Sequence, residues 1–149
     1  MSETIGIVGI GLMGSAISHH LIQSGFKVKG YDMDPLRLDE FAERGGIPVH
    51  TASEVANGVK WMVLSLPDSN IVNDVVFREN GILDKDREGL IICDASTSRP
   101  EDSENLGKEL ALRKVKFLDT CVSGTSAMAW KKDLIVVAGG ERVDFEKSL

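Results

Sequence analysis

The stretch from Ile5 to Gly14, which reads IGIVGIGLMG, constrains the fold more than any other part of the sequence. Its first residues are rich in β-branched side chains, as is typical of a buried β-strand. Apolar residues then recur at helical spacing from Met13 to Leu21. Between the two patterns, Gly9, Gly11 and Gly14 have GxGxxG spacing. Together these features predict a strand that ends in a tight glycine turn and opens directly into a helix.

Each glycine has its own physical role in such a turn. Gly9 permits the sharp change of direction, Gly11 lets a pyrophosphate approach the backbone, and Gly14 lets the helix and strand pack closely. The unpaired amides at the start of the helix then face the phosphates, and the helix dipole favours bound anions there. We therefore predict a dinucleotide-binding turn. A purely structural strand-turn-helix unit, followed by a surface aspartate, is the alternative.

An acidic residue follows the turn at the distance that a dinucleotide fold requires. The stretch from Phe26 to Asp32 alternates like a second strand, and Asp32 lies 18 residues beyond Gly14. At that place such folds use an acid to bind the adenosine ribose hydroxyls. Asp32 and nearby Asp34 would repel the 2′-phosphate of NADP, and Arg37 could partly offset this repulsion if it swings across the site. The sequence therefore favours NAD over NADP.

The composition indicates one globular domain and argues against several classes of partner. A chain of 149 residues, 42% of them hydrophobic, can bury a substantial core. Its net charge of −6 argues against nucleic acid or an anionic membrane as partner, because both need a clustered basic face. No apolar run approaches the length of a membrane span, and the N-terminus lacks the pattern of a signal peptide. We therefore expect a cytoplasmic protein.

The cysteines and histidines predict neither a disulfide framework nor a metal site. Cys93 and Cys121 are too few for such a framework and lack metal-ligand spacing, so we expect two buried thiols. His19 and His20 are neighbours on the predicted helix, and their side chains diverge by about 100°, which prevents them from sharing a metal. His50 stands alone.

The rest of the chain alternates between apolar strands and helical patterns. Four further strands are predicted, at 61–67, 90–94, 115–120 and 134–140, and polar loops follow the first three of them, at 68–70, 95–100 and 121–130. Residues 144–149 begin a last helix. Such alternation predicts an α/β fold: a doubly wound, mostly parallel, Rossmann-like sheet with helices on both faces. The loops at the carboxyl ends of its strands should gather around one crevice.

At these loops the sequence resembles the β-hydroxyacid dehydrogenase family, which includes 3-hydroxyisobutyrate dehydrogenases and tartronate semialdehyde reductases. The motifs that carry the resemblance span nearly the whole chain: GIVGIGLMG, YDMDP, LSLP, CDASTSRP, DTCVSG and VVAGG. The resemblance implies that residues 1–149 are an NAD(P)-binding domain that ends inside its last helix. It also implies that the C-terminal helical domain of the family, through which members form homo-oligomers, is absent from this chain.

The resemblance also implies roles for individual residues. The pyrophosphate, ribose, adenosine and nicotinamide-ribose contacts of the cofactor fall on Gly9, Gly11, Leu12, Met13, Gly14, Asp32, Leu66, Pro67 and Thr97. The start of the loop that binds the carboxylate of a hydroxy-acid substrate falls on Ser123, Gly124 and Thr125. The simpler alternatives are that Ser96 and Thr97 cap the following helix, and that Ser123 is an ordinary turn serine.

This substrate loop departs from the family pattern. Cys121 replaces a proline, Thr125, Met128 and Lys132 each replace a glycine, and Asp133 replaces a threonine. Because such glycines permit a positive φ or a close backbone approach, the replacements predict a different loop shape. Altered specificity and lost activity are both open at this point.

Hydride transfer between a nicotinamide cofactor and a small 3-hydroxy acid is the activity that the resemblance implies. The family's catalytic lysine lies beyond Leu149, so we expect these 149 residues to bind a dinucleotide and to turn over little or no hydroxy acid. Proton-transfer groups contribute about 10²- to 10⁴-fold to such rates. A noncatalytic dinucleotide-binding or interaction module and an imine reductase-like enzyme are the alternatives, and Ser123 favours carboxylate recognition over the latter.

Overall fold

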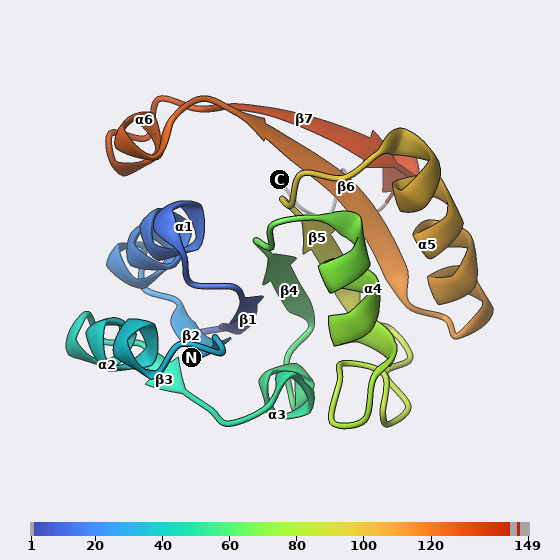
Figure 1. The fold of residues 1–149 in the computed structure, drawn as a ribbon, viewed down its shortest axis with the longest axis horizontal. Coiled ribbons are helices and arrows are strands. Elements are labelled where there is room, and N and C mark those ends of the chain that lie inside the picture. Colours follow the sequence, from blue (N-terminus) through green and yellow to red (C-terminus); the bar gives the residue numbers. More distant parts are fainter. Residues whose placement is uncertain (1, 144–145, 147–149) are drawn as a thin grey trace.

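The computed structural model describes residues 2–143 and 146, and its strands and helices alternate along the chain (Figure 1). In chain order these elements are β1 (Thr4–Val8), α1 (Leu12–Gln23), β2 (Lys27–Tyr31), α2 (Pro35–Glu43), β3 (Ile47–Pro48), α3 (Ala52–Ala56), β4 (Trp61–Leu64), α4 (Ser69–Phe77), β5 (Ile91–Asp94), α5 (Pro100–Leu112), β6 (Lys116–Ser123), α6 (Ser126–Trp130) and β7 (Ile135–Gly140).

The strands form one sheet in the order β3-β2-β1-β4-β5-β6-β7. All neighbouring pairs are parallel except β6 and β7, which are antiparallel. The order runs outward in both directions from β1 and β4, so the crossover helices are divided between the two faces. The predicted doubly wound, mostly parallel α/β fold with helices on both faces is confirmed. The topological switch lies between β1 and β4, where open sheets of this kind bind ligands.

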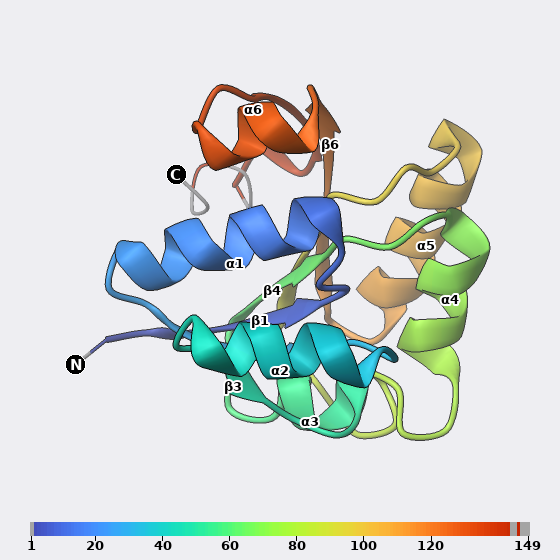
Figure 2. The same cartoon turned by 60° about the vertical axis from the view of Figure 1, so that its left-hand side comes forward.

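The two long strands β6 and β7 extend beyond the sheet as an arm that carries α6, and we call residues 121–137 the β6–β7 arm. Ser123 pairs with Ile135 near its tip, and both views show α6 lying beside α1 (Figures 1 and 2). The prediction of an irregular loop over 121–130 is therefore wrong at both ends. Residues 121–123 continue β6 because β7 pairs with them, and residues 126–130 form a helix.

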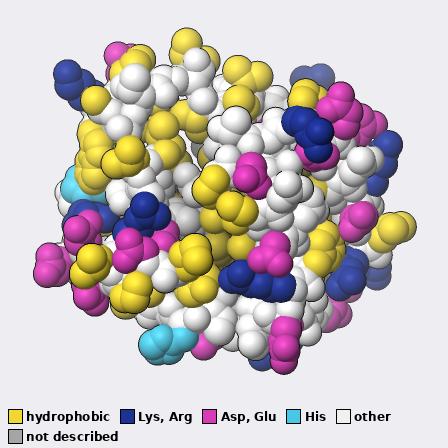
Figure 3. All heavy atoms as spheres, viewed as in Figure 1, with side chains coloured by type: hydrophobic (Ala, Val, Ile, Leu, Met, Phe, Trp, Pro, Cys, Tyr) yellow, Lys and Arg dark blue, Asp and Glu magenta, His cyan; other side chains and the backbone are white. Residues whose placement is uncertain are grey.

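The arm exposes many apolar side chains (Figure 3, upper left). Among the exposed hydrophobic residues of α6 and β7 are Met128, Trp130, Ile135, Val136 and Val137. The free thiol of Cys121 is also exposed here, whereas Cys93 is partly buried. The expectation of two buried thiols is therefore wrong for Cys121, because this part of β6 lies beyond the helices that cover the sheet.

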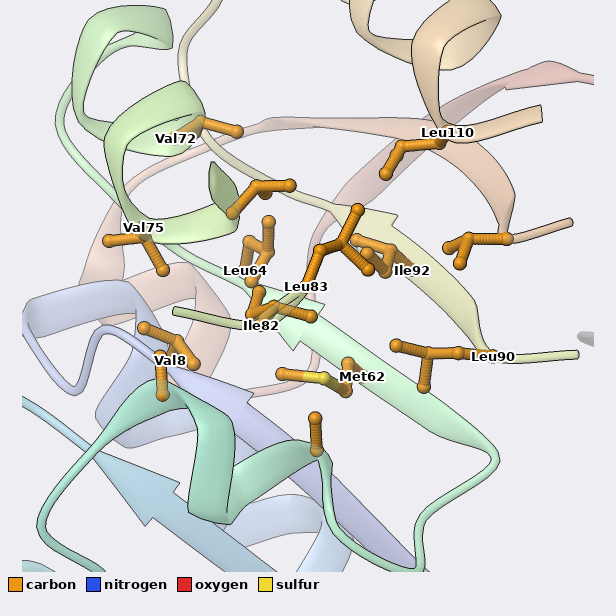
Figure 4. Close-up of a cluster of buried hydrophobic side chains, with 14 of the residues drawn as sticks. Val8, Met62, Leu64, Val72, Val75, Ile82, Leu83, Leu90, Ile92 and Leu110 are labelled. Atoms are coloured by element: carbon orange, nitrogen blue, oxygen red, sulfur yellow. The ribbon is translucent and has the colours of Figure 1, made fainter. Parts of the chain in front are cut away.

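The sheet separates two hydrophobic clusters, one on each face. On the larger side, Met62 and Leu64 of β4 pack against side chains from α3, α4 and α5 (Figure 4). On the other side, Val63 points into a smaller cluster around Phe41, with residues of α1 and α2. Alternate residues of one strand thus face opposite layers, as the two-residue period of a strand requires. This explains why residues 61–64 are continuously apolar.

Several local signals have the predicted effect, and the boundaries shift by a few residues. Pro35 begins α2 with Asp34 as its N-cap, and Gly25 follows α1 with φ +94°. The strand predicted at 61–67 ends at Leu64, and the final helix predicted at 144–149 lies mostly outside the described residues. Among the described residues, no helix is long and apolar enough to cross a membrane.

Candidate functional site

The glycine turn between β1 and α1 is closed at its two ends and open in the middle. A Cβ atom on Gly9, where φ is +93°, would lie 2.1 Å from the carbonyl oxygen of Ser65, and one on Gly14 would lie 2.0 Å from the carbonyl oxygen of Gly9. For a Cβ on Gly11, the nearest atom in the described part of the chain would be the Nη1 atom of Arg37, at 3.8 Å. Gly9 and Gly14 are therefore needed for packing, whereas Gly11 leaves space that a ligand can enter.

The helix that starts at this turn has no side-chain cap. Gly11 is the N-cap of α1, and among the described residues no side chain caps this end of the helix by accepting a hydrogen bond. Leu12 is 78% exposed and Met13 is half-buried, so the first turn faces outward rather than into the core. Uncapped amides and the positive end of the helix dipole together favour an anion at this position.

Asp32 ties the end of β2 to the glycine turn. Its Oδ2 atom accepts a hydrogen bond from the Ile10 amide at 2.8 Å, and its Oδ1 atom accepts one from the Asp34 amide at 2.9 Å. The side chain is only 5% exposed, and the Nη1 atom of Arg37 lies 3.6 Å from Oδ2. The structure therefore brings together the glycine turn and the acid that the sequence places after the second strand.

The loops after β4 and β5 are joined by a hydrogen bond that the sequence did not reveal. The Leu66 amide donates to the Ser96 hydroxyl at 2.8 Å, and the Ser96 amide donates to the Asp94 carboxylate at 2.9 Å. Leu66 also borders the glycine turn, since its Cδ2 atom would lie 3.0 Å from a Cβ on Gly9. The spacing Asp-x-Ser in CDAS, typical of an Asx turn, was the available signal for this pair.

Burial is the main influence on the pKa of Asp94. Desolvation raises the pKa of its carboxyl group, the hydrogen bonds from Ser96 oppose this shift, and the nearby charge of Asp119 adds to it. The buried carboxyl supports the backbone of the β5 loop, and Thr97 on that loop is exposed. Neither Ser96 nor Thr97 caps α5, because its N-cap is Arg99 and no side chain of residues 2–143 forms a capping hydrogen bond there. That alternative for Ser96 and Thr97 is therefore wrong.

A second polar link joins the starts of α4 and α5. The Ser69 hydroxyl donates to Asp102 at 2.6 Å, and Arg99 donates to the same carboxylate at 2.9 Å. The hydrogen bond from Ser69, followed by that from Arg99, holds the pKa of Asp102 below its usual value. These contacts fix the same edge of the sheet as the Ser96 bond, at the carboxyl ends of β4 and β5.

The candidate substrate residues lie at the tip of the β6–β7 arm, and all three are exposed. Ser123 ends β6, Gly124 has φ +138°, and the Thr125 hydroxyl accepts a hydrogen bond from the Met128 amide as the N-cap of α6. Ser123 is therefore a strand residue rather than an ordinary turn serine. Lys132 stands where the family pattern has a glycine, and its backbone is left-handed, with φ +58°.

Helix α6 is held against α1 by aromatic and polar contacts. The Nε2 atom of His20 lies 2.8 Å from the Ala129 carbonyl oxygen, and the His19 ring centroid lies 5.0 Å from that of Trp130. Both histidines therefore contact the β6–β7 arm. Within the described part of the chain, no group of three or more His, Cys, Asp or Glu residues is placed to hold a metal ion.

Comparisons with known proteins show the family of this chain. The model of the NAD binding domain of 6-phosphogluconate dehydrogenase matches residues 4–149. Glyoxylate/succinic semialdehyde reductase 1 of Arabidopsis thaliana is 31% identical over 145 residues, which are 97% of this chain and 50% of that protein.

Solved structures have the same fold. The 3-hydroxyisobutyrate dehydrogenase of Mycobacterium tuberculosis, solved with L-serine, superposes with a TM-score of 0.91 at 23% identity, over 99% of this chain and 50% of that one. An imine reductase of Myxococcus stipitatus, a V8 variant in complex with NAD+, gives a TM-score of 0.88 at 18% identity, over 99% of this chain and 50% of that one. The chain thus spans about half the length of these proteins.

Proposed function

Since this chain belongs to the family of the NAD binding domain of 6-phosphogluconate dehydrogenase, we propose that it is the cofactor half of a 3-hydroxyacid dehydrogenase. The observation that carries the proposal is the open space at Gly11 between two glycines that are packed shut. A side chain at position 11 would fill this space, and a pyrophosphate fits it. The family and the fold support a dinucleotide as the ligand, and the motifs of the chain support a hydroxy acid as the substrate.

In this proposal each candidate residue has one role toward the cofactor. The amides from Gly11 to Gly14 bind the pyrophosphate, with Leu12 and Met13 between them. Asp32 accepts hydrogen bonds from the adenosine ribose, while Leu66 and Pro67 contact the adenosine half and Thr97 the nicotinamide ribose. The bound nicotinamide supplies a hydride donor or acceptor. Toward the cofactor, the residues of this half bind and orient it.

We propose NAD rather than NADP as the preferred cofactor. Asp32 and Asp34 place two carboxylates beside the proposed ribose position, and Asp32 is fixed there by two backbone amides. A 2′-phosphate would bring about −1.5 to −2 further charge next to them. The proximity of Arg37 to Asp32 and Asp34 reduces this repulsion without removing it.

The substrate side of the proposal rests on the β6–β7 arm. Ser123, Gly124 and Thr125 would bind the carboxylate of the hydroxy acid, and the proton acceptor would come from a helical domain that follows residues 1–149 in the complete homo-oligomeric enzyme. The relatives that are twice as long support this division. On this basis the 149 residues bind cofactor and turn over little or no hydroxy acid.

A calorimetric titration of the chain with NADH tests the proposal. We expect saturable binding of one NADH, about 10-fold weaker in Asp32→Asn, which corresponds to about 1.4 kcal/mol. Asp74→Asn is the matched control, because Asp74 is an exposed carboxylate on α4 that pairs with Arg78. The absence of saturable NADH and NADPH binding in a folded chain would contradict the proposal.

One observation favours a noncatalytic dinucleotide-binding module as a second candidate. The Thr125 hydroxyl, a candidate substrate donor, already serves as the N-cap of α6. The two candidate functions differ in whether the complete protein turns over a hydroxy acid. A Ser123→Ala variant that raises KM for 3-hydroxyisobutyrate without altering NADH affinity would support the enzyme. Saturable NADH binding without any turnover by the complete protein would support the module.

A further inference from the structure

Helix α6 is too short to be stable by itself, so its position depends on what it packs against. It has five residues, Ser126–Trp130, and lies at the tip of the β6–β7 arm. Isolated helices of fewer than about 12 residues are marginal in water. Figures 1 and 2 show α6 beside α1, the helix that starts at the glycine turn. The contact between these two helices therefore sets the position of the tip of the arm.

His20 binds the end of α6 through one hydrogen bond. Its Nε2 atom lies 2.8 Å from the Ala129 carbonyl oxygen, and Nε2 must carry the proton because a carbonyl oxygen only accepts. The last carbonyl groups of a helix lack partners further along the helix, and a histidine side chain can supply one. At the other end of α6, the Thr125 hydroxyl accepts from the Met128 amide. Side chains thus fix both ends of α6.

The apolar packing between α1 and the arm is incomplete beside this hydrogen bond. A groove of about 280 Å³ runs between them, with Ile17 and Leu21 of α1 on one side and Leu134 of the arm on the other. Trp130, whose ring lies against that of His19, is 41% exposed. Apolar contact is non-directional, whereas a hydrogen bond requires a fixed distance and angle. The bond from His20 therefore determines how α6 sits on α1.

The turn that holds the candidate substrate residues is packed against the same part of the arm. A Cβ atom on Gly124 would lie 2.7 Å from Leu134 Cδ2 and 3.6 Å from Met128 Cε. The turn therefore rests on a side chain of α6 and on the residue that precedes β7. Ser123 and Thr125 flank Gly124, so a shift of α6 on α1 would displace all three residues.

The other end of α1 is fixed at the proposed cofactor site. The Ser15 hydroxyl in its first turn donates to the Ile10 carbonyl oxygen at 3.1 Å. His20 lies eight residues beyond Leu12, which is about 12 Å along a helix. Helix α1 therefore keeps the glycine turn and the arm at a fixed separation, with His20 at the contact.

We propose that His20 is a positioning residue for the proposed hydride transfer. By binding the Ala129 carbonyl it holds Ser123 to Thr125 where the carboxylate of the hydroxy acid is bound in front of the cofactor. In this role His20 contacts neither substrate nor cofactor and acts through α6. The inference rests on the proposed function, and it deepens the function by assigning the residue that aligns the substrate arm with the cofactor turn.

Three variants separate the hydrogen bond from the ring that makes it. His20→Phe keeps an aromatic ring and loses the donor. His20→Gln keeps a donor, because its Nε2 atom is as many bonds from Cα as that of histidine. His50→Phe is the matched control, since His50 is exposed on the segment before α3. Hydrogen exchange of the α6 amides and NADH titration use this chain, and steady-state kinetics with 3-hydroxyisobutyrate use the complete protein.

We expect His20→Phe to speed exchange of the Lys132 and Asp133 amides, which bond to carbonyls of α6. The factor should be about threefold to tenfold, the range for one lost hydrogen bond, with exchange in α5 unchanged. In the complete protein, kcat/KM for 3-hydroxyisobutyrate should fall by about the same factor, while the Kd of NADH changes by less than about twofold. His20→Gln should restore both quantities to within about twofold of the original, and His50→Phe should alter neither.

Two results would overturn the inference alone. Unchanged kinetics in His20→Phe despite faster exchange in α6 would mean that His20 stabilises the arm without aligning the substrate, and a loss that His20→Gln does not reduce would mean that the hydrogen bond is not the cause. If His20→Phe does not fold, His20→Ala takes its place in both measurements. Failure of the original chain to bind NADH, or of the original complete protein to turn over 3-hydroxyisobutyrate, would overturn the proposed function and the inference with it. These failures are seen before any variant is compared, so the two cases are distinguishable.

Discussion

Replacing Gly11 with alanine adds one methyl group in the open part of the glycine turn. The nearest protein atom to this methyl would be Arg37 Nη1 at 3.8 Å, which is ordinary van der Waals contact. Gly11 has φ −77° and ψ −155°, an extended conformation that alanine also adopts. Alanine in place of glycine at an N-cap costs up to about 1 kcal/mol. The reduced entropy of the unfolded chain offsets about 0.4 to 1 kcal/mol of this cost.

The effect on cofactor binding should be far larger than the effect on folding. The methyl occupies the space through which a pyrophosphate would approach the backbone, and hydrogen bonds weaken when phosphate oxygens are pushed beyond about 3.2 Å. One hydrogen bond to a charged group contributes about 1.5 to 3 kcal/mol. Its loss would weaken NADH binding by about 10- to 150-fold, at 1.4 kcal/mol per factor of ten. The melting temperature should change by no more than about 4 °C.

Calorimetric titration of NADH and a thermal melt measure the two effects separately. Gly139→Ala is the control, since a Cβ on Gly139 would meet none of the described residues within 4 Å and the residue lies on β7. If folded Gly11→Ala binds NADH as tightly as Gly139→Ala does, then phosphates do not approach the chain at Gly11. The assignment of the turn as a cofactor site would then be wrong.

Three further predictions concern stability, each measured by urea unfolding. Lys132→Gly should stabilise the fold by up to about 1 kcal/mol, because φ at this residue is +58°, whereas Lys131→Gly at φ −89° should destabilise it. His20→Ala should cost about 1 to 2 kcal/mol by removing the bond to the Ala129 carbonyl, with NADH affinity unchanged. Asp94→Asn should be at least as stable as the original chain at pH 7. The pKa of Asp94 is raised in the folded state, so ionisation destabilises the fold as pH rises, and the difference between the two proteins should disappear at acidic pH where Asp94 is protonated.

The sequence was most informative where several local signals agree. At the first strand and helix, β-branched residues, spaced glycines and a helical period all predicted the same unit, and β1 and α1 form it. The N-cap at Asp34 and the left-handed residue at Gly25 also followed from local chemistry. These features need only neighbouring residues, so one sequence suffices to predict them.

Features that depend on distant partners were not predictable in the same way. Residues 121–123 become strand because β7 pairs with them, and α6 forms where the short segment SAMAW is capped by Thr125 and packs on α1. The bond between Leu66 and Ser96 spans 30 positions. For the site, the sequence named Asp32 and Arg37, and only the folded chain shows that Arg37 lies between Asp32 and the open side of Gly11.

Helix α1 connects the proposed cofactor and substrate regions of this chain. Its first turn follows the glycine turn, and His19 and His20 in its second half contact α6, which begins directly after Ser123 to Thr125. The arm therefore has a defined shape even though the glycines of the family pattern are replaced. Thr125 gains a capping bond, and Lys132 adopts the left-handed conformation that the glycine would have permitted. Through the contacts of His19 and His20 with α6, helix α1 holds the arm in a defined position relative to the glycine turn.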